Sequence, residues 1–173
     1  MSLTLGYDTR GNSIMMGLPP FYYYDMAAFS QISKNRLATC NFELQLLFNY
    51  MIQFYDFAVV DGYRTKEKQH EYFLSGASKI DYPTVHNTKP SNAVDVYAYE
   101  INHIDWGKLQ SAYFAGWVMG IAARLYEEGK IFHRIRCGID WYMNNDIDDT
   151  TFWDSGHFEI VPNFNETFNY YET

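Results

Sequence analysis

Residues 85–97 read VHNTKPSNAVDVY, and residues 153–160 read WDSGHFEI. Each contains a short run in which apolar and polar side chains alternate, which is typical of a strand that buries one of its faces. In the first run, Val94 and Val96 point to one side of the strand and Asp95 points to the other. The fold is therefore expected to contain strands that pack one apolar face against the core and carry polar residues on the opposite face.

The second run follows the same pattern. Phe158 and Ile160 share one face, and His157 lies on the opposite one. If the two strands pair side by side, Asp95 and His157 come within reach of each other. His86 stands nine residues before Asp95, in a loop long enough to turn back toward the same place.

Imidazole nitrogens and carboxylate oxygens are ligands that suit zinc. His86, Asp95 and His157 would supply three ligands and leave a fourth position open for water, as in a catalytic zinc site. Asp154 stands three residues before His157, close enough to hold a carboxylate over that position. Taken singly, each histidine has a simpler explanation as a hydrogen-bonding residue of the surface or the core. An aspartate between two valines of a strand nevertheless needs a partner, which would be a metal ion or an arginine.

The remaining pattern predicts an α+β fold: a compact single domain whose small antiparallel sheet carries the zinc site and is flanked by helices. Residues 1–28 are expected to be irregular, and residues 29–173 to form the domain. The expected helices are a short one capped by Ser33 or Asn35, one from the cap Asn41 to Ile52, one from the cap Thr65 to Gly76, and one over residues 106–129. The expected strands are residues 57–60, 93–99, 139–141 and 157–161.

Composition narrows the range of partners. The formal net charge of −8 argues against nucleic acid and against an anionic membrane surface. The most apolar stretch, residues 113–123, is too short to span a bilayer, so no membrane insertion is expected. No secretory signal is visible at the N-terminus, which favours a cytoplasmic location in the producing cell. Cys40 and Cys137 are expected to be reduced and buried.

Three motifs in order carry a family resemblance: DGYRT at residues 61–65, His86 with AVD at 93–95, and DSGHFE at 154–159. With them the chain resembles the M15-type zinc peptidases that cut peptidoglycan stem peptides, and most of all the phage endolysins that are L-alanyl-D-glutamate peptidases. The resemblance covers about residues 33–161. One departure is the step of nine residues between His86 and Asp95, which is often seven in the family; the difference lies in a loop, where added length is tolerated.

The resemblance implies one zinc ion per chain, with His86, Asp95 and His157 as ligands and Asp154 as the general base. It implies that Arg64 contacts the substrate or its oxyanion, although a structural ion pair at the turn is an alternative. The implied partner is the peptidoglycan stem peptide, cut by a monomer after its release to the cell wall. The alternatives are a D-alanyl-D-alanine carboxypeptidase or dipeptidase, a wall-binding module without turnover, and a structural zinc domain.

The other polar candidates have less specific surroundings. Glu159 and Asp140 are expected either to orient the ligands or to be exposed. The three remaining histidines, namely His70, His103 and His133, are expected to be solvated.

Overall fold

The computed structural model describes residues 27–99, 107–163 and 166 in full, and only the backbone of residues 5–7, 13–15, 100 and 103–104. The helices are α1 (Gln31–Leu37), α2 (Phe42–Met51), α3 (Lys66–Ser75) and α4 (Lys108–Glu127), with a 3-10 turn η1 at Val85–Asn87. The strands are β1 (Leu5–Tyr7), β2 (Ser13–Met15), β3 (Phe57–Asp61), β4 (Ala93–Glu100), β5 (His103–Ile104), β6 (Arg134–Gly138) and β7 (Asp154–Val161). The predicted α+β class is confirmed.

The central sheet has the strand order β3-β4-β7-β6, and every neighbouring pair is antiparallel. β5 pairs with the end of β4, and β1 pairs with β2 in a separate hairpin. The pairing of β4 with β7 sets Asp95 directly opposite His157, as the alternation of the two strands predicts.

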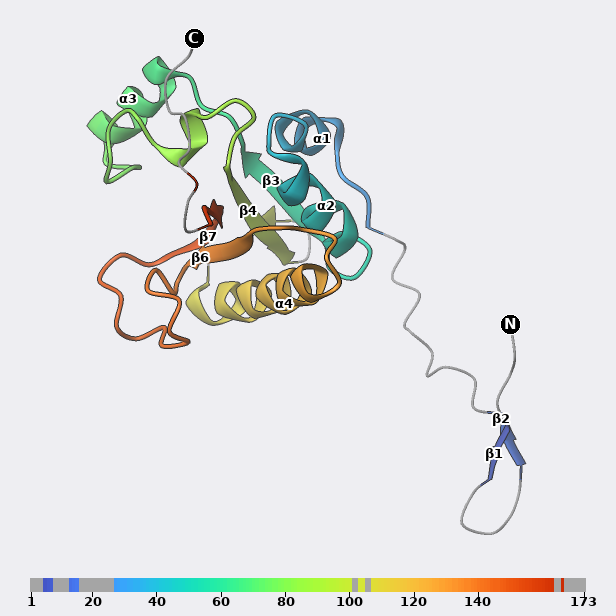
Figure 1. The fold of residues 1–173 in the computed structure, drawn as a ribbon. Coiled ribbons are helices and arrows are strands. Elements are labelled where there is room, and N and C mark those ends of the chain that lie inside the picture. Colours follow the sequence, from blue (N-terminus) through green and yellow to red (C-terminus); the bar gives the residue numbers. More distant parts are fainter. Residues whose placement is uncertain are drawn as a thin grey trace.

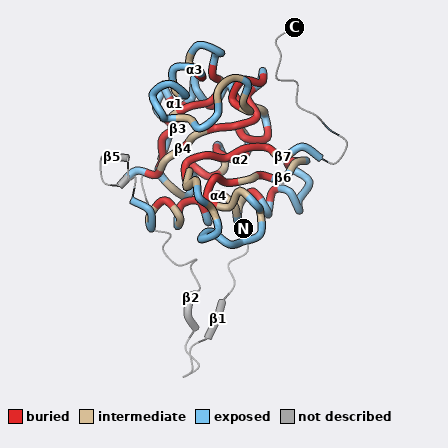
Figure 2. The backbone as a smooth tube through the Cα atoms, turned by 90° about the vertical axis from the view of Figure 1, so that its left-hand side faces the viewer, coloured by how far each residue is buried: buried red, intermediate tan, exposed pale blue. Residues whose placement is uncertain are grey.

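Helices α2 and α4 cover one face of this sheet, and Figure 1 shows α4 lying across it beneath β4, β6 and β7. Phe48 of α2 and Phe114 of α4 both contact Phe158 of β7, with ring centroids 5.6 and 6.5 Å apart. Val94 and Val96 are fully buried on this same side. Figure 2 shows the buried backbone concentrated in the sheet and in α2. The polar residues of β4 and β7 therefore lie on the face that these helices leave open.

The helix signals were partly right. Asn41 caps α2 by accepting a hydrogen bond from Glu43 N, and Thr65 caps α3 by accepting one from Lys68 N. α3 ends before Gly76, as predicted, and Gly76 has the left-handed conformation. The expected cap of the first helix was wrong: Ser30 caps α1, and Ser33 lies inside it, buried, where its hydroxyl accepts a hydrogen bond from Val59 N.

The strand predictions differ from the structure in β6 and β7. Residues 139–141 were expected to be extended, but they lie in the turn that follows β6. β7 begins at Asp154, three residues earlier than expected. Both differences come from the pairing of Arg134–Gly138 with β7, since strand partners far apart in sequence decide where a strand begins and ends.

Two further expectations concern the ends and the cysteines. The segment expected to be irregular, residues 1–28, contains the β1–β2 hairpin, and most of its other residues lie outside the described part of the chain. Cys40 and Cys137 are buried free thiols, as predicted, and burial raises the pKa of each to about 12. Within the described residues, no helix has the length and apolar character needed to cross a bilayer.

Candidate metal centre

Three predicted ligand residues converge at the middle of the open sheet face. His86 Nε2 lies 3.3 Å from His157 Nδ1 and 3.3 Å from Asp95 Oδ1. His157 Nδ1 lies 3.1 Å from the same Asp95 oxygen. These three atoms are close enough together to hold one metal ion. Among the described residues, they form the cluster of histidine, cysteine and acidic side chains that meets this condition.

The outer nitrogen of each imidazole is already used. His86 Nδ1 lies 2.8 Å from the carbonyl oxygen of Gly62, and a carbonyl can only accept, so this nitrogen carries the proton. His157 Nε2 lies 2.9 Å from Glu159 Oε2, which as a carboxylate also accepts. The two inner nitrogens therefore face Asp95, and each presents a lone pair to it whenever its imidazole is neutral. Three such atoms attract a cation between them, either a proton on His157 or a metal ion that replaces this proton.

The pKa values of His157 and Asp95 agree with this attraction for positive charge. Burial lowers the pKa of His157, but its hydrogen bonds with Asp95 and Glu159 outweigh burial and raise the pKa to about 10. Burial raises the pKa of Asp95, yet the nearby His86, His157 and Arg64 hold it well below its usual range. The cluster thus keeps an ionised carboxylate and attracts positive charge to the space between its members.

One backbone hydrogen bond and one from a side chain hold the turn that positions His86. Arg64 N donates to His86 O at 2.9 Å, and Asn87 Nδ2 donates to Arg64 O at 2.8 Å. η1, which carries His86, is therefore joined to the turn after β3. This arrangement explains how a loop residue is held as firmly as the two strand residues opposite it.

Arg64 lies between two carboxylates. The sheet register sets Asp61 opposite Asp95, with an irregularity at Val60 of β3. Arg64 Nε donates to Asp61 Oδ2 at 2.7 Å, and Nη2 donates to Asp95 Oδ2. The side chain is buried, and its guanidinium also lies over the Tyr72 ring. These contacts support the ion-pair alternative for Arg64 over direct contact with a substrate.

Asp154 lies beside the cluster at the first position of β7, opposite Gly138 of β6. A side chain at Gly138 would overlap the backbone oxygen of Asp154, so only glycine permits this close approach. Burial, reinforced by the negative charge of Asp95, raises the pKa of Asp154. The Tyr97 hydroxyl donates to Asp154 Oδ1 at 3.4 Å. Asp154 is thus a half-buried carboxylate with a raised proton affinity next to three convergent candidate ligand atoms, as a proton acceptor requires.

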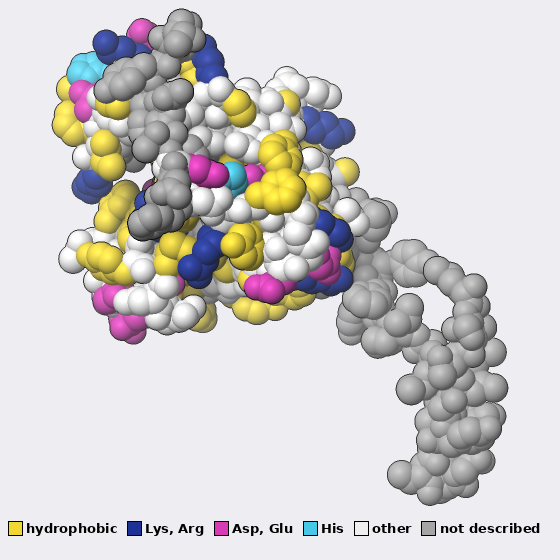
Figure 3. Space-filling view, viewed as in Figure 1, with side chains coloured by type: hydrophobic (Ala, Val, Ile, Leu, Met, Phe, Trp, Pro, Cys, Tyr) yellow, Lys and Arg dark blue, Asp and Glu magenta, His cyan; other side chains and the backbone are white. Residues whose placement is uncertain are grey.

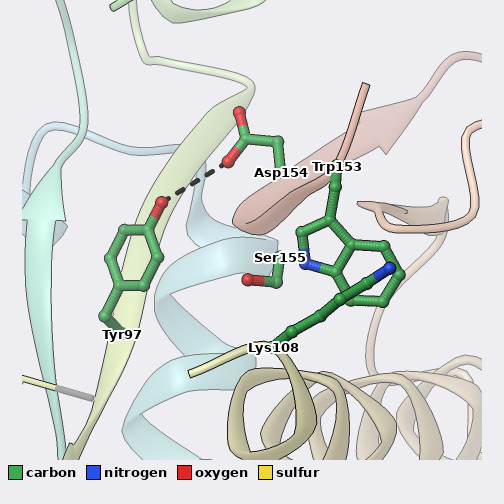
Figure 4. A pocket seen from close by; sticks show the side chains of 5 residues that line it. All are labelled: Tyr97, Lys108, Trp153, Asp154 and Ser155. Atoms are coloured by element: carbon green, nitrogen blue, oxygen red, sulfur yellow. Dashed lines mark hydrogen bonds between the residues drawn. The ribbon is translucent and has the colours of Figure 1, made fainter. Parts of the chain in front are cut away.

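A pocket of about 360 Å³ opens at Asp154. Its lining residues are Tyr97, Lys108, Trp153, Asp154 and Ser155, and Figure 4 shows the Tyr97 hydroxyl directed at Asp154 with the Trp153 and Lys108 side chains on the other side. On the face shown in Figure 3, histidine and acidic side chains lie side by side next to hydrophobic ones. The open sheet face therefore offers both polar and apolar contacts to a ligand.

Two residues that contact the His157–Glu159 pair, Arg136 and Trp141, were not identified from the sequence. Arg136 Nε donates to Glu159 at 2.8 Å, and Trp141 lies against the His157 ring at 5.4 Å between centroids. Glu159 is 5% exposed and contacts His157, which agrees with the ligand-orienting alternative. Asp140 instead accepts hydrogen bonds from Asn144 N and Asn145 N and shapes the following loop.

The three remaining histidines were expected to be solvated, and the structure confirms this for one of them. His70 is exposed and pairs with Asp81, so it is solvated as expected. The expectation was wrong for His133, which is largely covered and contacts the buried Glu43. The side chain of His103 lies outside the described residues.

Residues 26–161 match the family model described as phage L-alanyl-D-glutamate peptidase. The chain belongs to this family. A relative, the L-alanyl-D-glutamate peptidase of Escherichia phage T5, is 30% identical over 139 residues, which cover 77% of this chain and 97% of the relative. The matched region contains every residue of the candidate centre.

The family fold also agrees with a solved structure. The L-Ala D-Glu endopeptidase ChiX of Serratia marcescens superposes with a TM-score of 0.60 at 20% identity, covering 81% of this chain and 94% of that one. At this identity the likeness shows a shared fold. Within the phage L-alanyl-D-glutamate peptidase family, the convergence of His86, Asp95 and His157 beside Asp154 is the chemical feature from which a function can be argued.

Proposed function

We propose that this protein is a zinc-dependent peptidase that hydrolyses the L-alanyl-D-glutamate bond of peptidoglycan stem peptides. The observation that carries the proposal is the convergence of His86 Nε2, Asp95 Oδ1 and His157 Nδ1 next to the half-buried carboxylate of Asp154. Membership of the phage L-alanyl-D-glutamate peptidase family supports the choice of substrate.

The donor set fits one zinc ion. Nitrogen and oxygen ligands about 2.0–2.1 Å from a tetrahedral ion stand about 3.3–3.4 Å apart. The three distances between the ligand atoms here are 3.1, 3.3 and 3.3 Å. Three protein ligands leave a position open, which distinguishes a catalytic site from a structural one. When bound, zinc supplies a Lewis acid that makes water nucleophilic at neutral pH and polarises the peptide carbonyl.

Asp154 acts as the general base and then the general acid. Its carboxylate takes a proton from the attacking water as the new carbon–oxygen bond forms. When the carbon–nitrogen bond breaks, the same proton passes to the leaving amine. The Tyr97 hydroxyl stays protonated, because burial and the charge of Asp154 raise its pKa, and it orients the carboxylate by its hydrogen bond.

Arg64 and Glu159 are positioning residues in this proposal. Arg64 occupies the second oxygen of Asp95, which leaves the first oxygen for the metal. Glu159 fixes the ring of His157, and Arg136 holds Glu159 in turn. Such outer contacts set the orientation and basicity of metal ligands.

The cellular setting follows from the same proposal. The protein would be made in the cytoplasm of the producing cell and would act on the wall, as a monomer, after its release. The phage relative, which is named an L-alanyl-D-glutamate peptidase, supports action on the wall.

The test is digestion of purified peptidoglycan, followed by mass spectrometry of the new termini. We expect new amino-terminal glutamate and new carboxy-terminal alanine in equal amounts. Release of free D-alanine without new glutamate termini would favour the carboxypeptidase alternative. Binding to walls without any new terminus would favour a module without turnover.

A further inference from the structure

The pocket beside Asp154 contains a cation that the proposed chemistry does not use. Lys108 is the first residue of α4, and its side chain lies along Trp153 with Nζ 4.1 Å from the ring centroid. Figure 4 shows both side chains next to Asp154 and Ser155. The aromatic face holds the long lysine side chain at the pocket wall.

The other cations near the centre are engaged by carboxylates. Arg64 pairs with Asp61 and Asp95, and Arg136 pairs with Glu159. In contrast, no carboxylate in the described part of the chain pairs with Lys108. Within a protein of net charge −8, this ammonium group is therefore available to an anionic ligand in the pocket.

Helix stability does not account for this lysine. The N-terminal end of a helix carries a partial positive charge, so an acidic residue stabilises the first turn and a basic residue does not. The first turn of α4 contains no acidic residue, and Gly107 provides no side-chain cap. A lysine at this position is better explained by the pocket that it lines.

We propose that Lys108, supported by Trp153, binds a carboxylate of the substrate's glutamate residue and selects acidic peptides. This inference rests on the proposed function. A glutamate joined to alanine through its amine has two carboxyl groups, and a linear peptide uses at most one of them to continue. The remaining carboxylate lies within a few bonds of the scissile amide, and Lys108 lines the pocket that contains the proton acceptor Asp154.

The test compares two synthetic stem peptides, one with the free glutamate carboxylate and one with that carboxylate amidated. kcat and KM are measured for the wild type, Lys108→Gln and Lys108→Glu, with zinc content and thermal unfolding recorded for each. Lys34→Gln is the matched control, since Lys34 is an exposed lysine of α1 outside the pocket lining.

For the acidic peptide, Lys108→Gln should lose about tenfold in kcat/KM, mostly through KM, because a charge-assisted contact made equally in the ground and transition states is removed. For the amidated peptide it should equal the wild type, and Lys108→Glu should prefer the amidated peptide. An equal loss on both peptides, or no loss on either, would overturn the inference while the proposed function stands. Cleavage of neither peptide by the wild type would overturn both.

Discussion

Asp61 and Asp95 face each other across β3 and β4, and Arg64 lies between them. Like charges opposite each other in a sheet are destabilising, and a buried guanidinium that pairs with both removes the repulsion. The same contact leaves one oxygen of Asp95 for the metal. The stability of the sheet and the orientation of Asp95 therefore both depend on Arg64.

Replacing Arg64 by alanine should lower the free energy of unfolding by about 3–5 kcal/mol, because two carboxylates lose a buried partner. Urea unfolding with a chelator present measures this loss. Lys68→Ala is the control: Lys68 also pairs with Asp61, but its side chain is 41% exposed, so its loss should stay below about 1 kcal/mol. Unchanged unfolding of Arg64→Ala together with slow turnover would instead support direct contact with the substrate.

The convergence of His86, Asp95 and His157 could be predicted from the sequence, whereas the residues that surround them could not. Asp95 and His157 are each a polar member of an alternating strand, and that local signal places both opposite the core face. The partner of Arg64 depends on the irregularity at Val60, which is decided by pairing between strands. Local sequence carries no comparable signal for such a shift in register.

Among the elements, β6 is a second case in which pairing between strands decides what the local sequence does not show. Arg134, Ile135, Arg136 and Cys137 alternate as in a strand, but the expected strand was placed at residues 139–141. In the structure Arg136 lies opposite Glu159 and pairs with it. Cross-strand pairs of opposite charge stabilise a sheet, and this pair is visible only once β6 and β7 are side by side.

A second feature at this scale is the packing of β4 against β7. A side chain at Gly156 would overlap the Tyr97 ring. Gly156→Ala should therefore lower the free energy of unfolding by about 1–3 kcal/mol, and a smaller residue at Tyr97 should recover part of the loss. Gly120→Ala in α4 is the control, since open space surrounds that position and alanine favours a helix. Equal stability of both variants would refute this account of the strand packing.

Glu43 joins α2 to the start of β6. It is buried and accepts hydrogen bonds from Phe132 N and His133 N, and its Oε1 lies 2.5 Å from His133 Nδ1. Partial burial lowers the pKa of His133, but its contacts with Glu43 and Glu166 outweigh burial and raise the pKa above its ordinary value of 6.5. Protonated His133 therefore stabilises the folded state.

This contribution should be complete below pH 6.5 and be lost as the pH rises through the raised pKa of His133. Thermal unfolding between about pH 5.5 and 9, measured with a chelator present to keep the protein free of metal, should show that loss. In His133→Asn the corresponding part of the pH dependence should disappear. The same slope in both proteins would show that another group is responsible.

For the whole molecule, the proposed metal centre would join three separate parts of the chain: η1, β4 and β7. An ion bound to the folded state alone stabilises it by mass action. The reference sample contains free zinc at roughly a hundred times its dissociation constant. Removing this zinc with a chelator should lower the melting temperature by about 5–10 °C. His157→Ala should melt at one temperature with or without chelator, and a shift like that of the wild type would remove His157 from the ligand set.

The central claim is that this centre is catalytic and that Asp154 moves the proton. The most direct measurement compares peptidoglycan hydrolysis by the wild type and Asp154→Asn at matched zinc content. The amide keeps the shape of the carboxylate but cannot accept the proton, so the variant should keep its zinc and fold while losing roughly 10²–10⁴-fold in rate. Equal rates for the two proteins would contradict the account, and loss of zinc together with activity would make Asp154 a ligand instead of the base.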